Sequence, residues 1–279
     1  MTLEPSAALL TGKVAVVTGG GGGIGRGIAE AFAAYGARVV IAEIDSERAA
    51  ATEQSIQQRG GEALVCVTDV REGDQVLALA ETTLRELGRV DVLVNNVGHY
   101  VVRGGAEFVE STPEQWLELY RTNLEHVFLC TRAFVPMLLD QGDGGSIVNL
   151  STVEAFRGIP RHSVYAAFKG AITQFTKSLA LELGNAGIRV NAIAPDLTES
   201  LQVRYDRWVP EDQRHLIPTW VPVGRFGTAD DLAGVAVFLA SDLSAFVTGT
   251  TVHADGGSLA AGGWYRREEG GWTNRPRTP

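Results

Sequence analysis

The segment Lys13-Val-Ala-Val-Val-Thr-Gly-Gly-Gly-Gly-Gly-Ile-Gly-Arg-Gly27 decides the fold of this chain. Residues 13–18 are an apolar run of strand length, and the residues from Ile24 onward carry the apolar face of a helix. Glycines in such a turn let the backbone approach a pyrophosphate, and the amino terminus of the helix faces its negative charge. The segment therefore predicts a dinucleotide-binding turn. A flexible linker is excluded, because a strand and a helix flank the glycines directly.

The rest of the chain is expected to alternate strands and helices, as a parallel sheet requires. We expect strands near 13–18, 37–42, 63–67, 91–95, 145–150, 188–193 and 250–253, and helices near 24–35, 46–58, 73–87, 113–138, 163–184 and 229–240. The predicted fold class is α/β, a doubly wound parallel sheet (Rossmann fold) with helices on both faces. Residues 1–279 are predicted to form a single domain, because no repeat or interior linker interrupts the pattern.

Composition narrows the classes of partner. The net charge is −9 without a basic run, which argues against nucleic acid and anionic membrane surfaces. No run of about eighteen apolar residues could span a bilayer, and the Glu4-Pro5 opening is not a signal peptide. Cys66 and Cys130 are expected to be reduced core residues, which predicts a cytoplasmic protein. We predict no metal site.

Glu43 follows the second expected strand. An acid at this place accepts hydrogen bonds from the adenosine ribose hydroxyls and repels a ribose phosphate. No Arg or Lys lies inside the glycine turn, Arg38 is expected at the opposite end of the strand, and no other compensating cation is expected near Glu43. These features predict NAD rather than NADP as the cofactor.

Tyr165 and Lys169 are four residues apart, so their side chains project from the same face of a helix. A phenol, with an ordinary pKa of about 10, is a poor base by itself. A nearby ammonium favours the phenolate and makes the tyrosine a usable proton acceptor or donor. The pair alone could be a coincidence of helical spacing, and its meaning depends on the other motifs.

These motifs together resemble those of the short-chain dehydrogenase/reductase family over nearly the whole chain. The family's motifs occur in order as Thr18-Gly-Gly-Gly-Gly-Gly23-Ile24-Gly25, Asp69-Val70, Asn95-Asn96-Val97-Gly98, Arg121-Thr-Asn123-Leu124, Tyr165-Ala-Ala-Phe-Lys169 and Arg189-Val190-Asn191. One difference is that Val97 replaces the family's usual alanine. The resemblance implies a Rossmann-fold catalytic domain and a homotetramer, since relatives are commonly tetramers.

The resemblance also implies the roles of single residues. Tyr165 would take the substrate hydroxyl proton, Lys169 would lower the pKa of Tyr165 and hold the nicotinamide ribose, and Asn123 would position a helix-bound water. The catalytic residues are then Asn123, Thr152, Tyr165 and Lys169. The implied cofactor-binding residues are Gly19, Gly23, Ile24, Glu43, Asp69, Val70, Asn96, Gly98, Tyr165, Lys169, Pro195, Thr198 and Ser200.

Three further positions depart from the family pattern. The catalytic serine usually lies thirteen residues before the tyrosine, where this chain has Thr152. Threonine keeps the hydroxyl, although its methyl group narrows the geometry. Ser151, expected on the other face of the strand, is the alternative. Glu154 replaces a usual small residue, and Asp196 replaces the glycine after Pro195; either acid could touch the substrate, or both could be exposed loop residues.

Residues 196–224 break the alternation with an aromatic-rich stretch that includes Trp208 and Trp220. Because ligands bind where strands of such sheets end, the stretch is predicted either as a lid over a hydrophobic substrate or as an excursion packed on its own domain. Three further residues are expected to shape the same cleft: His99, Tyr100 and His162. The tail at 264–279, rich in aromatic residues, is expected either to cover a neighbouring subunit or to fray.

The function predicted from the resemblance is the NAD-dependent interconversion of a secondary alcohol and a ketone, on a hydrophobic ring-containing substrate. One alternative is an NADPH-dependent 3-oxoacyl-carrier reductase, against which Glu43 argues. Another is a catalytically silent nucleotide-binding scaffold, against which the joint retention of Asn123, Tyr165 and Lys169 argues.

Overall fold

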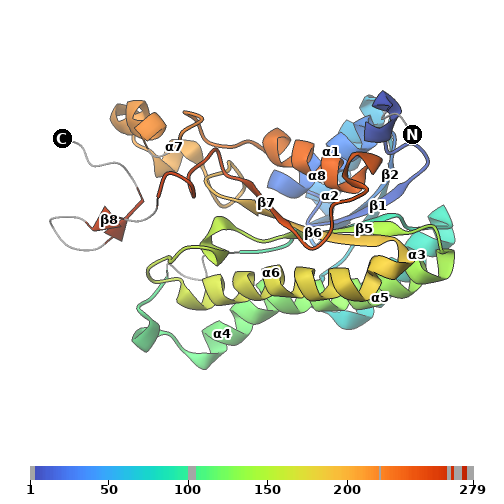
Figure 1. Cartoon of the computed structure of the whole chain (residues 1–279), viewed down its shortest axis with the longest axis horizontal. Coiled ribbons are helices and arrows are strands. Elements are labelled where there is room, and N and C mark those ends of the chain that lie inside the picture. The colour runs from blue at the N-terminus through green and yellow to red at the C-terminus, as the bar shows by residue number, and fades with distance from the viewer. Residues whose placement is uncertain (1–3, 100–104, 220, 263–264, 267–271, 275–279) are drawn as a thin grey trace.

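The predicted doubly wound sheet is confirmed in a computed structural model of the chain, which describes residues 4–99, 105–219, 221–262, 265–266 and 272–274 (Figure 1). Within these residues the main sheet has seven parallel strands in the order β3-β2-β1-β4-β5-β6-β7. The strands are β1 (Val14–Thr18), β2 (Arg38–Glu43), β3 (Glu62–Val67), β4 (Val92–Asn95), β5 (Gly145–Leu150), β6 (Ile188–Pro195) and β7 (Thr251–Ala254). The expected strands differ from these mainly at their ends.

Helices cover both faces of the sheet (Figure 1). One layer contains α1 (Gly23–Ala34), α2 (Ser46–Gln58) and α8 (Ala229–Ala240), and the other contains α3 (Gly73–Leu87), α4 (Pro113–Tyr120), α5 (His126–Gln141) and α6 (Ser163–Leu183). A separate apolar core fills each side. Every residue of β1 is fully buried, because alternate side chains enter the two cores. Short 3-10 turns lie at Pro5–Ala8, Phe108–Glu110, Val153–Ala155, Gly184–Ala186 and Asp242–Ser244.

The expected helix at 113–138 is interrupted by a wider π-helical turn at Arg121–Glu125, between α4 and α5. Asn123 lies in this turn, and its side-chain Nδ2 donates to the Leu119 carbonyl oxygen at 3.0 Å. A side chain that binds the carbonyl four residues back competes with the regular helical ladder. Such π turns occur frequently at functional sites.

The segment after β6 contains α7 (Tyr205–Trp208) and a 3-10 helix at Glu211–Thr219. Four buried residues form a small apolar cluster here: Val209, Ile217, Val221 and Phe226. The cluster is internal to the segment, so both interpretations of the segment stay predictions. The side chain of Trp208 and the whole of Trp220 lie outside what the structure describes.

The tail forms a short antiparallel pair, β8 (Tyr265–Arg266) with β9 (Trp272–Thr273). The rest of the predicted tail, 264, 267–271 and 275–279, lies outside the described residues. Its contact with a neighbouring subunit stays a prediction. In the described part of the chain, no helix has the length and apolar character needed to cross a membrane. Neither Cys66 nor Cys130 forms a disulfide; Cys130 is buried in the core as predicted, whereas Cys66 is only partly buried.

Candidate active site

A cavity of about 870 Å³ opens at the carboxyl ends of the central strands. From β1 the chain adds β2 and β3 on one side, and it then crosses back to add β4 on the other side of β1. The connections that follow β1 and β4 therefore run in opposite directions across the sheet. Ligands of doubly wound sheets bind at such a point. The volume lies in the upper part of the range of roughly 300–1,000 Å³ for ligand pockets, which leaves room for a cofactor and a substrate together.

The glycine turn has the features of a phosphate cradle. Gly19 and Gly23 have φ of 65° and 52°, a region that side chains disfavour. A Cβ on Gly25 would lie 2.2 Å from the Gly19 carbonyl oxygen, so only glycine permits this close approach. Gly22 caps α1 without a side-chain hydrogen bond, and Gly22, Gly23 and Ile24 line the cavity. The unpaired amides at the start of α1 therefore suit the pyrophosphate of a dinucleotide.

Glu43 lies at the end of β2 on the cavity wall, with only 6% of its surface exposed. Its Oε2 accepts from the Gly21 amide at 3.1 Å, and its Oε1 accepts from Arg48 Nη2 at 2.9 Å. The expectation that Glu43 has no compensating cation nearby is therefore wrong. Arg48 lies in the first turn of α2, which folds back toward the strand end, and it also pairs with Asp45 at 3.2 Å.

Four further residues implied as cofactor-binding also line the cavity. Asp69 forms an ion pair with Arg71 at 2.6 Å, and this hydrogen bond holds the pKa of the Asp69 carboxyl below its usual value. Val70 is buried beside it. Asn96 donates from Nδ2 to the Thr18 carbonyl oxygen at 2.9 Å, which ties the loop after β4 to the glycine turn. Gly98 follows on the same loop.

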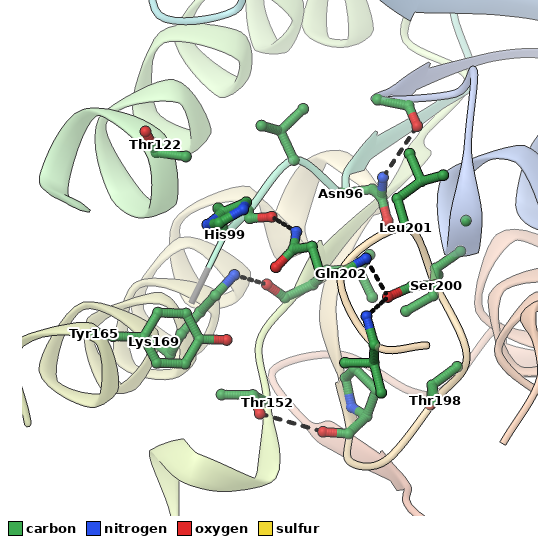
Figure 2. Close-up of a pocket in the computed structure, with 18 of the residues that line it drawn as sticks. Asn96, His99, Thr122, Thr152, Tyr165, Lys169, Thr198, Ser200, Leu201 and Gln202 are labelled. Carbon is green, nitrogen blue, oxygen red and sulfur yellow. Dashed lines mark hydrogen bonds between the residues drawn. The ribbon is translucent and has the colours of Figure 1, made fainter. Parts of the chain in front are cut away.

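Tyr165 and Lys169 lie side by side on α6 and face the cavity (Figure 2). Lys169 Nζ is 6.0 Å from the centre of the Tyr165 ring and donates to the Leu150 carbonyl oxygen at 2.9 Å. Lys169 is 3% exposed, and its burial lowers the pKa of the ammonium to about 8. The two residues, which were predicted to share one helix face, therefore lie close together at the carboxyl end of the sheet.

Asn123 reaches the site from the π turn and is fully buried. Its Oδ1 accepts from the His99 amide, and its Nδ2 donates to the His99 carbonyl oxygen, both at 3.0 Å. The amide group therefore clamps the main chain just beyond Gly98. Asn123 is not among the residues that line the cavity, whereas its neighbour Thr122 is.

Thr152 and Ser151 both line the cavity but have different partners. The Thr152 hydroxyl donates to the Pro195 carbonyl oxygen at 3.3 Å (Figure 2). The Ser151 hydroxyl donates to the Lys169 carbonyl oxygen at 3.1 Å and is buried against α6. The Thr152 hydroxyl thus links the end of β5 to the end of β6, whereas the Ser151 hydroxyl binds the main chain of α6.

Pro195, the last residue of β6, lines the cavity together with Thr198 and Ser200, which follow the strand. Ser200 Oγ accepts from the amides of Gln202 and Val203, which closes a tight turn. Gln202 Nε2 then donates to the Gly98 carbonyl oxygen at 2.6 Å. Residues 197–203 therefore cross from one wall of the cavity to the other, so the start of the predicted lid does border the site.

The two unusual acids are buried, and the interpretation of both as exposed loop residues is wrong. The side chains of Glu154 and Asp196 are 9% and 8% exposed. Arg157 binds both, at 3.0 and 2.9 Å, and this pairing explains how two carboxylates can lie in the wall. Arg157 was not predicted from the sequence, although an arginine three residues after an unusual acid was a usable signal.

Some of the other lining residues were predicted and others were not. His99 and His162 line the cavity as expected, whereas Tyr100 lies outside the described residues. Arg161, which has φ of 68°, and Asn274 of the tail also line it. Neither residue carried a local signal in the sequence, because both are brought to the site by tertiary folding. Among the described residues, no cluster of three or more metal-ligating side chains occurs.

The fold and the cavity together place this protein among nucleotide-dependent oxidoreductases built on a Rossmann-type sheet. A family model described as "Enoyl-(Acyl carrier protein) reductase" matches residues 5–258. The chain therefore belongs to the short-chain dehydrogenase/reductase family.

Curated relatives and solved structures agree with this assignment. The 3-oxoacyl-(acyl-carrier-protein) reductase FabG of Thermotoga maritima is 37% identical over 248 residues, which cover 89% of this chain and 98% of the relative. A 7α-hydroxysteroid dehydrogenase complexed with NADH and 7-oxo glycochenodeoxycholic acid has a TM-score of 0.85 at 30% identity and covers 92% and 98% of the two chains. A Beutenbergia cavernae protein with NADP at low occupancy has a TM-score of 0.83 at 35% identity, covering 91% and 99%.

Proposed function

We propose that this protein is an NAD-dependent dehydrogenase or reductase that interconverts a secondary alcohol and a ketone. The observation that carries the proposal is the buried Tyr165–Lys169 pair, which faces the same cavity as the glycine turn and Thr152. A proton-transfer residue and a nucleotide site in one cavity suit hydride chemistry on a carbinol.

Each catalytic residue has a specific task in this proposal. When bound, the nicotinamide supplies the hydride acceptor for alcohol oxidation. Tyr165 takes the hydroxyl proton of the substrate, and the positive charge of Lys169 favours the resulting phenolate state. The Thr152 hydroxyl, which donates to the Pro195 carbonyl oxygen in the free protein, turns to donate its hydrogen bond to the substrate oxygen. Asn123 holds the widened helical turn, where we place the water that passes the proton to solvent.

The proposed choice of NAD rests on Glu43. Arg48 and the acids Glu43 and Asp45 form an ion-pair group whose formal charge is one negative unit. A ribose 2′-phosphate placed here would meet the carboxylate of Glu43 at the cavity wall, whereas ribose hydroxyls could donate to it. Arg48 reduces the preference for NAD over NADP but does not reverse it.

Substrate class follows from the lining of the cavity in the same proposal. Apolar side chains of Ile159, Pro160, Leu197 and Val203 line it together with His99 and His162. This lining suits a hydrophobic ring-containing substrate with a few polar groups. The hydroxysteroid dehydrogenase among the structural neighbours, crystallised with a steroid ligand, supports this choice.

A 3-oxoacyl-carrier reductase that uses NADPH is the second candidate, and one specific observation favours it. Several curated relatives, including those of Thermotoga maritima and Chlamydia muridarum, carry this name at 36–37% identity. Glu43 at the ribose position argues against NADPH. The silent scaffold is the third candidate, and the intact Tyr165–Lys169 pair argues against it.

The deciding experiment is a cofactor and substrate screen on the purified protein. We expect NADH formation from ring-containing secondary alcohols with NAD, read at the NADH absorbance, and loss of nearly all turnover in Tyr165→Phe with NADH binding retained. Phenylalanine keeps the ring but lacks the exchangeable proton. Equal activity of Tyr165→Phe and wild type would contradict the mechanism. Faster reduction of a 3-oxoacyl thioester with NADPH than oxidation of any alcohol with NAD would favour the second candidate.

The proposal also includes a cytoplasmic homotetramer. The two free thiols suit a reducing compartment. Light scattering on the purified protein measures the oligomeric state directly.

A further inference from the structure

A buried ion cluster joins three loops on the wall of the cavity, apart from the Tyr165–Lys169 pair. We call Glu154, Arg157, Asp196 and Ser258 the Arg157 cluster. Arg157 Nη2 donates to Glu154 Oε1 at 3.0 Å and to Asp196 Oδ2 at 2.9 Å, and its Nε donates to Glu154 Oε2 at 3.3 Å. The Ser258 hydroxyl also donates to Asp196 Oδ2. One guanidinium therefore holds two carboxylates.

The cluster lies beyond the last paired residues of three adjacent strands. Strands β5 and β6 are last paired at Leu150 and Ile193, and β6 and β7 at Pro195 and Ala254. Glu154 and Arg157 follow β5, Asp196 follows β6, and Ser258 follows β7. The ion pairs thus connect the three loops beyond the last backbone pairing of the sheet.

The groups that the cluster joins are next to the proposed chemistry. Glu154 is two residues beyond Thr152, and Asp196 directly follows Pro195. Thr152 itself donates to the Pro195 carbonyl oxygen at 3.3 Å. Any separation of Glu154 from Asp196 would therefore be transmitted to the pair formed by Thr152 and Pro195.

Burial makes the charge balance of the cluster important. The side chain of Arg157 is only 10% exposed, similar to its two partners. Burial by itself would lower the pKa of Arg157, but the hydrogen bonds and charges of Glu154 and Asp196 raise it overall. Removal of the guanidinium would leave two buried carboxylates that repel each other, which is a strongly unfavourable arrangement.

We propose that Arg157 is a positioning residue, which by binding Glu154 and Asp196 holds Thr152 and Pro195 at the separation needed for hydride transfer. This inference rests on the proposed oxidoreductase function and adds a residue to it. Arg157 itself is not among the residues that line the cavity, so it acts through its partners. The planar guanidinium fork suits this task, because it can bind two carboxylates with fixed geometry, whereas an ammonium is a point charge.

Three variants test the proposal. Arg157→Met removes the bridge and leaves both acids unpaired. Arg157→Lys keeps the charge without the fork. The triple variant Glu154→Ala/Arg157→Met/Asp196→Gly removes the whole ion group and is the matched control, because it lacks both the bridge and the repulsion.

We expect Arg157→Met to lower kcat about tenfold or more, since a shift of about 1 Å in a catalytic group costs as much as a hundredfold. KM for the alcohol and Kd for NADH should stay within about threefold, because Arg157 contacts neither ligand in the proposed site. Arg157→Lys should fall between Arg157→Met and wild type. The triple variant should recover part of kcat over Arg157→Met, since the repulsion is gone, but should stay below wild type, since the bridge is gone as well. An unchanged kcat in Arg157→Met, or wild-type kcat in the triple variant, would overturn the proposal.

A measurement without turnover separates this inference from the proposed function. In Arg157→Met, the amides of residues 152–156 and 196–198 should exchange hydrogen about tenfold faster than in wild type, while those of β4 stay unchanged. Equal exchange in the two proteins would refute the positioning role even if no alcohol is oxidised. Absence of turnover in wild type would instead contradict the proposed function. If Arg157→Met does not fold, Arg157→Lys provides the test. A kcat and hydrogen-exchange rates in Arg157→Lys equal to those of wild type would overturn the role of the guanidinium fork.

Discussion

Replacement of Lys169 by methionine should make the cofactor-free protein more stable near neutral pH while it abolishes catalysis. Lys169 is 3% exposed, and burial lowers its pKa from 10.5 to about 8. At about 1.4 kcal/mol per pKa unit, burying the charged ammonium costs roughly 3 kcal/mol of folding free energy. Methionine has a similar length and no charge, but it loses the hydrogen bond to Leu150, worth about 1 kcal/mol. We therefore expect Lys169→Met to gain about 2 kcal/mol at pH 7.

The pH dependence of this gain in stability tests the prediction more strictly than the gain itself. Between pH 8 and 10.5 the unfolded chain keeps the proton of Lys169 and the folded chain has released it, so wild-type stability from this group rises with pH. The advantage of Lys169→Met should therefore shrink toward zero as pH rises through this window. His126 does not interfere, because burial, and then the charge of Lys169, lower its pKa to about 3 and keep it neutral throughout.

Urea unfolding at pH 7 and pH 10, at one fixed protein concentration, measures both effects. Lys177→Met is the matched control, since Lys177 is an exposed lysine on the same helix, α6, and should give no such pH-dependent gain. A Lys169→Met protein less stable than wild type at pH 7, or a gain that does not change with pH, would refute the argument from burial.

Two further predictions concern the cofactor and the catalytic hydroxyl. Glu43→Ala should raise the preference for NADPH over NADH about a hundredfold, since it removes a charge worth up to ~4 kcal/mol at short range and releases Arg48 for the 2′-phosphate. The ratio of kcat/KM with the two cofactors measures this preference. The gain should be smaller in Glu43→Ala/Arg48→Ala, which lacks the released cation, and an unchanged ratio in the single variant contradicts the role of Glu43. Thr152→Val should cost roughly 2–4 kcal/mol in the barrier, about a hundredfold in kcat, whereas Thr152→Ser should retain activity. Ser151→Ala should be mild; loss of turnover in that variant, with Thr152→Val intact, would make Ser151 the catalytic hydroxyl.

Much of the fold was predictable because it depends on local patterns. The glycines at 19–23 lie between an apolar strand and an amphipathic helix, and that order alone predicts the first turn of a doubly wound sheet. Tyr165 and Lys169 were predictable for a similar reason, because a spacing of four residues brings side chains together in any helix. The π turn at Asn123 was not, since it depends on how one amide is shared between Leu119 and His99.

What the sequence determined by itself is therefore the sheet, its glycine turn and the residues that a fixed spacing brings onto one helix face. Only the tertiary structure decided the partners of Glu43, the burial of Glu154 and Asp196 beside Arg157, and the approach of Gln202 to Gly98. Arg157 and Asp196 are 39 residues apart, and Gln202 and Gly98 are 104 apart. Regular backbone geometry relates residues within a few positions of each other, whereas contacts at these separations exist only after the strands have assembled and their loops meet at one edge of the sheet.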